Sequence, residues 1–194
     1  MLRGYLFISL AIAAALLAAG CGDDDSEDAP ESPPETAEAV PELPGGWTVH
    51  RNQNAGVAVG VPPAWSAEND GNDILIRSPE RLVAATILAD RSDEALETPL
   101  DQLAETTITG ITGIRDLEPG ETVEYKHRYD AVEIDAVGVA GKQDVKQDFQ
   151  LVLLRRDDLA TFTVLVARNA EENTNAYDDE IKRMIASIRT RPPG

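Results

Sequence analysis

The sequence predicts an α+β fold in which an antiparallel β-sheet is sandwiched between helices. Short alternating or apolar runs, separated by turn residues, recur along residues 47–167 and predict strands. Two segments, near 98–111 and 177–189, place apolar residues at helical spacing. The runs at 149–154 and 162–166 are almost continuously apolar, which is typical of strands covered on both faces. The helices are therefore expected to cover the sheet on both sides.

The strands begin with a predicted hairpin, because two short alternating runs flank the turn-rich segment 52–56. Pro62 and Pro63 end the second run, since proline has no N–H to donate to a strand ladder. Residues 66–71 are interpreted as a polar turn. The predicted strands are 47–51, 57–61, 73–77, 82–90, 121–129, 131–140, 148–155 and 160–167.

Both helices are predicted from their ends and from one apolar face. Thr98 is expected to cap the first helix, with Pro99 in its first turn. Its apolar face consists of Leu100, Leu103, Ala104, Thr107, Ile108 and Ile111. The face of the second helix consists of Tyr177, Ile181, Met184, Ile185 and Ile188. Acidic residues 178–180 occupy its first turn and Arg189 its last, which suits the helix dipole.

The N-terminal segment has the order of a secretory signal peptide. Arg3 supplies a positive charge, residues 5–19 form an apolar stretch, and the small residues 18–20 lead into Cys21. The stretch is shorter than the roughly 20 apolar residues that a permanent membrane span needs. Residues 1–20 are therefore expected to be an export signal.

Cys21 is the only cysteine of the chain and stands where such a signal is cut. The segment resembles a bacterial lipoprotein signal, in which small residues precede the cysteine that receives a diacylglyceryl group. The resemblance implies cleavage between Gly20 and Cys21, and a protein anchored by its lipid on the extracytoplasmic face of the cell membrane. The alternatives are an ordinary signal peptide with a chance cysteine, or an uncleaved anchor helix.

Residues 21–46 are predicted to be a lipidated cysteine followed by a disordered acidic spacer. Segment 22–46 holds nine carboxylates, no basic residue and five of the twelve prolines. Repulsion between like charges and a lack of apolar groups prevent such a segment from folding. A calcium site at residues 23–25, or a surface for basic polymers, is the sharper alternative. The folded domain is then expected at 47–194.

Composition excludes several classes of function. The 194 residues contain 17 Lys and Arg against 35 Asp and Glu, so the formal net charge is -18. Because nucleic-acid binding depends on clustered cations, a nucleic-acid partner is not expected. A single cysteine excludes a disulfide within the chain and any multi-cysteine metal site.

The start of the domain and its element order resemble those of a known family. Two hairpin strands lead to the sequence Pro62-Pro63-Ala64-Trp65, and a helix, a long meander and a closing amphipathic helix follow. This order is similar to PsbP-like α/β/α sandwich domains, and particularly to actinobacterial lipoproteins of the LpqN type. Ala64 stands where glycine is common in that family. The resemblance implies accessory, protein-contacting roles and no shared catalytic residues.

A search for catalytic, cofactor-binding or metal-binding motifs finds none. No GxSxG, GxGxxG or HExxH pattern occurs. Residues 66–71 superficially suggest the start of a calcium loop, but Ser66 stands at the first ligand position and Arg77 at the twelfth, where a glutamate is needed. His50 and His127 are expected to be ordinary strand residues. Glu133 and Asp135 project from one side of a strand and are interpreted as a solvated face rather than a catalytic pair. Trp47 and Trp65 are expected to be core or rim anchors, with an aromatic ligand platform as the alternative.

Two functions from different classes remain. The first is a non-catalytic binding or accessory module of the cell envelope, with no cofactor and with an envelope protein as its partner. An open apolar groove would instead favour a lipid or small-molecule carrier. The second is an envelope hydrolase whose site is assembled from distant residues, such as His127 with nearby carboxylates.

Overall fold

The computed structural model describes residues 42–90, 98–140, 145–156, 161–172 and 174–190. The predicted signal peptide, Cys21 and most of the predicted spacer lie outside these residues. The larger sheet contains β3 (Ser66–Asp70), β4 (Asp73–Arg77), β5 (Val83–Asp90), β6 (Ile114–Glu124), β7 (Asp130–Ala140), β8 (Val145–Arg155) and β9 (Thr161–Asn169). The smaller sheet contains β1 (Thr48–Asn52), β2 (Val57–Val61) and β10 (Arg189–Thr190).

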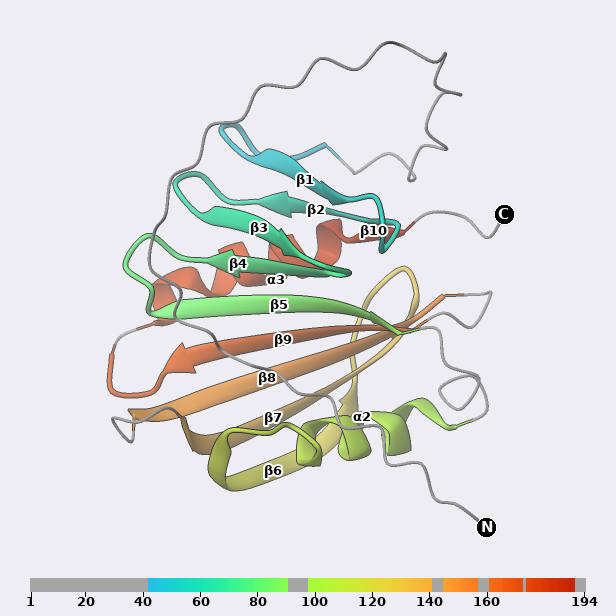
Figure 1. Cartoon of the computed structure of the whole chain (residues 1–194), viewed down its shortest axis with the longest axis vertical. Helices are drawn as coiled ribbons and strands as arrows, with labels where there is room; N and C mark the ends of the chain where they lie inside the picture. Colours follow the sequence, from blue (N-terminus) through green and yellow to red (C-terminus); the bar gives the residue numbers. More distant parts are fainter. Residues whose placement is uncertain (1–41, 91–97, 141–144, 157–160, 173, 191–194) are drawn as a thin grey trace, which may run out of the picture.

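All strand pairs in the two sheets are antiparallel. The larger sheet has the order β3-β4-β5-β9-β8-β7-β6, and the smaller one the order β1-β2-β10 (Figure 1). The central strands β8 and β9 are joined by a long ladder that runs from the pair Gln147–Asn169 to the pair Arg155–Thr161. Within the apolar runs 149–154 and 162–166 every residue except Gln150 is buried, as these runs predict.

Helices α2 (Leu100–Thr109) and α3 (Asp178–Ser187) cover different parts of the larger sheet (Figure 1). Helix α2 contacts β6, β7 and β8, whereas α3 lies behind β4 and β5 and contacts β2. Two separate clusters of buried side chains result, one with α3 and one with α2. The predicted α+β fold, an antiparallel sheet between helices, is confirmed.

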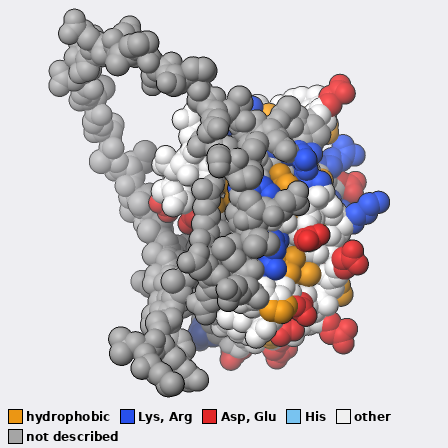
Figure 2. Space-filling view, turned by 90° about the vertical axis from the view of Figure 1, so that its right-hand side faces the viewer, with side chains coloured by type: hydrophobic (Ala, Val, Ile, Leu, Met, Phe, Trp, Pro, Cys, Tyr) orange, Lys and Arg blue, Asp and Glu red, His pale blue; other side chains and the backbone are white. Residues whose placement is uncertain are grey.

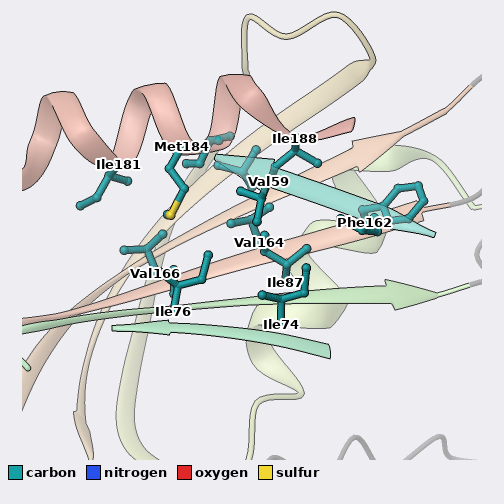
Figure 3. Packing of buried hydrophobic residues seen from close by; sticks show 14 of the residues in the cluster. Val59, Ile74, Ile76, Ile87, Phe162, Val164, Val166, Ile181, Met184 and Ile188 are labelled. Atoms are coloured by element: carbon teal, nitrogen blue, oxygen red, sulfur yellow. The ribbon is translucent and has the colours of Figure 1, made fainter. Parts of the chain in front are cut away.

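The cluster below α3 is the larger one. In Figure 3, Ile181, Met184 and Ile188 point from the helix side toward the aliphatic side chains of the sheets. Val164 and Val166 supply the floor of this cluster from β9, and both are fully buried. On the opposite face, Ala104 and Ile108 of α2 pack into the second cluster. Its sheet members are Ile134, Ala136, Ala140, Phe149, Leu151, Leu153 and Leu165.

The strands of the structure differ from the predicted ones in three main respects. Residues 66–70 form the edge strand β3 rather than a turn, because an edge strand needs only one hydrogen-bonded neighbour and tolerates a polar sequence. Strand β6 spans Ile114–Glu124 rather than 121–129, so His127, expected in a strand, lies beyond its end. Register shifts between Arg115 and Glu118 and between Pro119 and Thr122 let turn-forming residues remain inside it. Strand β10 was not predicted.

The helix ends also differ from their predictions. Pro99, not Thr98, occupies the N-cap position of α2, and no side chain caps the helix there. The residue before a proline is biased toward extended backbone, which keeps Thr98 outside the helix. Helix α3 ends at Ser187, so Arg189 lies beyond its last turn and pairs with Ala58 in the smaller sheet.

Candidate functional site

The sheet face that packs against α3 is only partly covered, and a groove of about 520 Å³ lies where β6 to β9 extend past the helix. Gln150 pairs with Val166, a member of the α3 cluster, so the polar side chains of Asp135, Asp148, Gln150 and Arg168 lie on the α3 side of the sheet. The groove is lined by Glu118, Pro119, Gly120, Asp135, Ala136, Val137, Asp148, Phe149, Gln150 and Arg168.

The ladders between strands bring the polar side chains of this groove together. Val137 pairs with Glu118 on one side and with Asp148 on the other, and Asp148 pairs with Arg168. Asp135 lies two residues before Val137 and pairs with Gln150. Directly paired residues project from the same face, and so do residues two apart on one strand. The groove is therefore floored by charged and amide groups from four strands.

A row of hydrogen bonds crosses this floor from α3 to β7. Arg168 donates from Nη1 to Asp178 Oδ1 at 2.9 Å, and from Nη2 to Gln150 Oε1 at 3.0 Å. Gln150 in turn donates from Nε2 to Glu133 Oε1. The Arg168 side chain retains 20% of its exposure, so Asp178 neutralises its charge in partly buried surroundings. The row Asp178–Arg168–Gln150–Glu133 fixes the floor of the groove.

Three carboxylates of the groove stand outside this row. Glu118, Asp135 and Asp148 are exposed, and within the described ranges none of them makes a hydrogen bond or an ion pair. Glu133 lies on the same face of β7 as Asp135, as the sequence predicts, but its side chain is held by Gln150. The groove thus carries negative charge that other side chains do not compensate.

Tyr125 follows the end of β6, and the acidic side chains of this face affect the pKa of its phenol. Burial raises the pKa of the Tyr125 phenol, and the nearby Glu133 carboxylate raises it further. The phenol therefore stays protonated and neutral at physiological pH. Val123, one strand position before Glu124, is the one large hydrophobic side chain that is exposed among the described residues, at 51%. It pairs with Glu133.

Both histidines serve structural contacts away from the groove floor. His50 Nε2 lies 2.9 Å from Asn69 Oδ1, which links β1 to β3. His127 lies in the β6–β7 connection, where its Nε2 donates to the carbonyl oxygen of Ile185 at 3.2 Å and its Nδ1 accepts from the backbone N–H of Tyr129 at 3.2 Å. Backbone groups therefore occupy both ring nitrogens of His127.

The pKa of His127 is lowered from its ordinary value of 6.5. Burial is the main cause, the hydrogen bond to Ile185 opposes it, and the positive charges of Arg189 and Arg128 lower the pKa further. The imidazole is therefore neutral at physiological pH, consistent with one nitrogen donating and the other accepting.

The other residues singled out in the sequence belong to a strand or pack in the α3 cluster. Residues 66–70 form a strand, and Trp65 is buried in the α3 cluster, where its ring meets Tyr177 edge-on at 5.5 Å between centroids. Trp47 packs against the same cluster.

Among the described residues, no group of three His, Cys, Asp or Glu side chains could hold a metal ion. Neither described helix has the length and apolar composition of a membrane span.

The side of the molecule that Figure 2 presents has a mixed surface. Where described residues are visible, basic and acidic side chains are interspersed and hydrophobic side chains form only small patches. This side therefore shows neither a broad cationic patch nor a broad apolar patch. The groove differs from it in that its exposed charged side chains are all acidic.

Comparison with known proteins identifies the fold. No protein-family model matches the chain, and no curated protein matches it. The Ran-binding protein Mog1p of Saccharomyces cerevisiae is similar in structure, with a TM-score of 0.52 at 9% identity over 74% of this chain and 95% of Mog1p. A point mutant of Mog1 gives the same TM-score and identity, over 75% of this chain and 96% of the mutant.

A protein of Bacteroides thetaiotaomicron is also similar, with a TM-score of 0.51 at 14% identity over 73% of this chain. The match covers 47% of that protein, so this chain corresponds to about half of its length. At such identities the likeness shows the fold alone. The chain has an α+β fold of the Mog1 and PsbP-like type.

Proposed function

We propose that this protein is a lipoprotein of the cell envelope, anchored to the extracytoplasmic face of the membrane through Cys21, and that its folded domain is a non-catalytic binding module. The observation that carries the binding role is the groove on β6 to β9. Its floor is fixed by hydrogen bonds between charged and amide groups, while Glu118, Asp135 and Asp148 remain available to a partner.

The arrangement of the histidines supports binding over hydrolysis. A general base needs a ring nitrogen that can reach substrate or nucleophile. Both nitrogens of His127 are hydrogen-bonded to backbone groups of Ile185 and Tyr129, and the groove carboxylates lie on other elements. The fold also occurs in Mog1p, which is described as a Ran-binding protein, so this scaffold is compatible with a protein-binding role.

The membrane anchor is tested by Cys21→Ser. We expect the variant to lose incorporation of a fatty-acid analogue and to leave the membrane fraction. Circular dichroism of the released protein should match that of the parent, because the described helices and strands begin at Thr48 and do not include Cys21. A Cys21→Ser protein that is still acylated would contradict the anchor.

The binding role is tested by photo-crosslinking in intact envelopes. Benzoylphenylalanine is introduced at Val137, in the groove, and at Gln102, on the exposed face of α2, as a matched control. We expect a discrete protein adduct from position 137 and none from position 102. The His50→Gln, His127→Gln double variant should form the same adduct, provided that it folds. Loss of the adduct in that folded variant would favour a histidine-dependent function.

A further inference from the structure

We infer that the groove binds an extended segment of a partner protein that carries basic side chains at alternate positions. This inference rests on the proposed binding role and specifies its chemistry. The exposed charged groups of the groove are the carboxylates of Glu118, Asp135 and Asp148. The one guanidinium in its wall, that of Arg168, is already neutralised by Asp178 at 2.9 Å.

The spacing of the carboxylates selects an extended ligand. Asp148 pairs with Val137, which lies two residues from Asp135 on β7, so the two aspartates are diagonal neighbours on adjacent strands. Such neighbours lie about 7–8 Å apart. In an extended chain, side chains two residues apart project from one side at about 7 Å. Alternate Lys or Arg residues of an extended segment therefore match Asp135 and Asp148.

The described residues do not form a metal site in this groove. A calcium ion takes six to eight oxygen ligands, and among the described residues no group of three His, Cys, Asp or Glu side chains could hold a metal ion. Glu118 is further from Asp148, because Val137 lies between them in one row and the two strand spacings add to about 10 Å. The carboxylates can each engage one cation of a longer ligand.

One cation limits the length of the basic stretch. Lys146 pairs with Val139, two residues beyond Val137 on the same face of β7. Lys146 is exposed, and its positive charge would repel a basic side chain placed over that row. The basic residues of the partner are therefore expected to lie over Asp148 and Asp135, with a neutral or acidic residue over Lys146.

The test uses isotope-labelled mature full chain and two threonine-rich heptapeptides in NMR titrations at physiological ionic strength. One peptide has arginine at its third and fifth positions, and the other has arginine at its third and fourth. Because adjacent side chains of an extended peptide point to opposite sides, only the first presents both arginines to the groove. We expect it to bind about threefold more tightly or better, with amide shifts in β7 and β8.

A matched pair of variants separates the groove from the overall negative charge. Asp135→Asn with Asp148→Asn should weaken binding of the first peptide about fivefold or more. Asp101→Asn with Glu105→Gln removes the same charge from exposed positions of α2 and should change it by less than about 1.5-fold. Equal affinities of the two peptides, or equal losses in the two variants, would overturn the inference. A crosslinked adduct at Val137 would in that case leave the binding role intact with another ligand chemistry.

Discussion

The α3-side face of the sheet has two halves built from the same strands. One half carries buried apolar side chains, and the other carries the polar side chains of the groove. Under the helix, β8 and β9 present Val152, Val164 and Val166, which are fully buried. Past the helix, the same strands present Asp148, Gln150 and Arg168 to the groove. The backbone ladder between the strands is continuous across the boundary. The rigidity of the groove therefore derives from a sheet whose other half is core.

The comparison predicts that truncation under the helix costs far more than truncation past it. Phe162→Ala removes a fully buried ring from the α3 cluster and should lower the free energy of unfolding by about 3–5 kcal/mol. Val123→Ala, at a side chain that is 51% exposed, should lower it by less than about 0.5 kcal/mol. Urea unfolding followed by circular dichroism measures both. Similar losses in the two variants would contradict the division of the face.

The hydrogen-bonded row joins the two halves, and breaking it should have an intermediate effect. Arg168→Met leaves Asp178 and Gln150 without their donor, and should lower the free energy of unfolding by about 1 kcal/mol. Arg77→Met is the matched control, because Arg77 pairs with Glu68 at the exposed sheet edge, where side-chain exposures are 36% and 58%. Its loss should be no more than about 0.5 kcal/mol. An equal decrease in the free energy of unfolding in both variants would show that the row stabilises the protein no more than an exposed ion pair does.

Much of the covered half could be predicted from the sequence, whereas the groove could not. The continuous apolar runs of β8 and β9 identify strands buried on both faces, and the spacing in α3 identifies Ile181, Met184 and Ile185 as its inner side. These signals are local. Glu133 and Asp135 are likewise placed on one side of β7 by their two-residue spacing.

The other groove residues become neighbours only through the pairing of the strands. Asp148 and Arg168 are twenty residues apart in sequence, and the register of the β8–β9 ladder sets them side by side. The register depends on the turn between the strands and on burial along their whole length, so no local pattern specifies it. One local signal of the groove is the polar side chain of Gln150, which interrupts an otherwise apolar run two residues before the buried Val152.

His127 attaches the β6–β7 connection to α3, and its protonation should weaken that attachment. Because burial lowers its pKa in the folded state, the unfolded chain binds the proton first as the pH falls below about 6.5. The free energy of unfolding should therefore decrease between the unfolded and the folded pKa of His127. Urea unfolding at about pH 7.5 and about pH 5.5 should show a smaller decrease in His127→Gln than in the parent. Equal decreases would contradict this role of the imidazole.

The smallest expected effect concerns the turn that leads from the small sheet into the covered half. Ala64 has a φ of 65°, in the left-handed region that favours glycine. The turn is held by a hydrogen bond from the Trp65 backbone N–H to the carbonyl oxygen of Pro62 at 3.3 Å, and it positions the buried Trp65 ring.

Replacing Ala64 with glycine should therefore stabilise the protein. A non-glycine residue in the left-handed region costs about 1–2 kcal/mol, and glycine adds about 0.4–1 kcal/mol of unfolded-state entropy, so the net gain is about 0.5–1 kcal/mol. Ala67→Gly is the control, because Ala67 lies in β3 with φ outside that region, and there glycine should destabilise by about 0.5–1 kcal/mol. Urea midpoints that move in opposite directions would support the argument, and a shared direction would contradict it. Since Ala64 is exposed and lies in neither half of the α3-side face, peptide binding in the groove should not change.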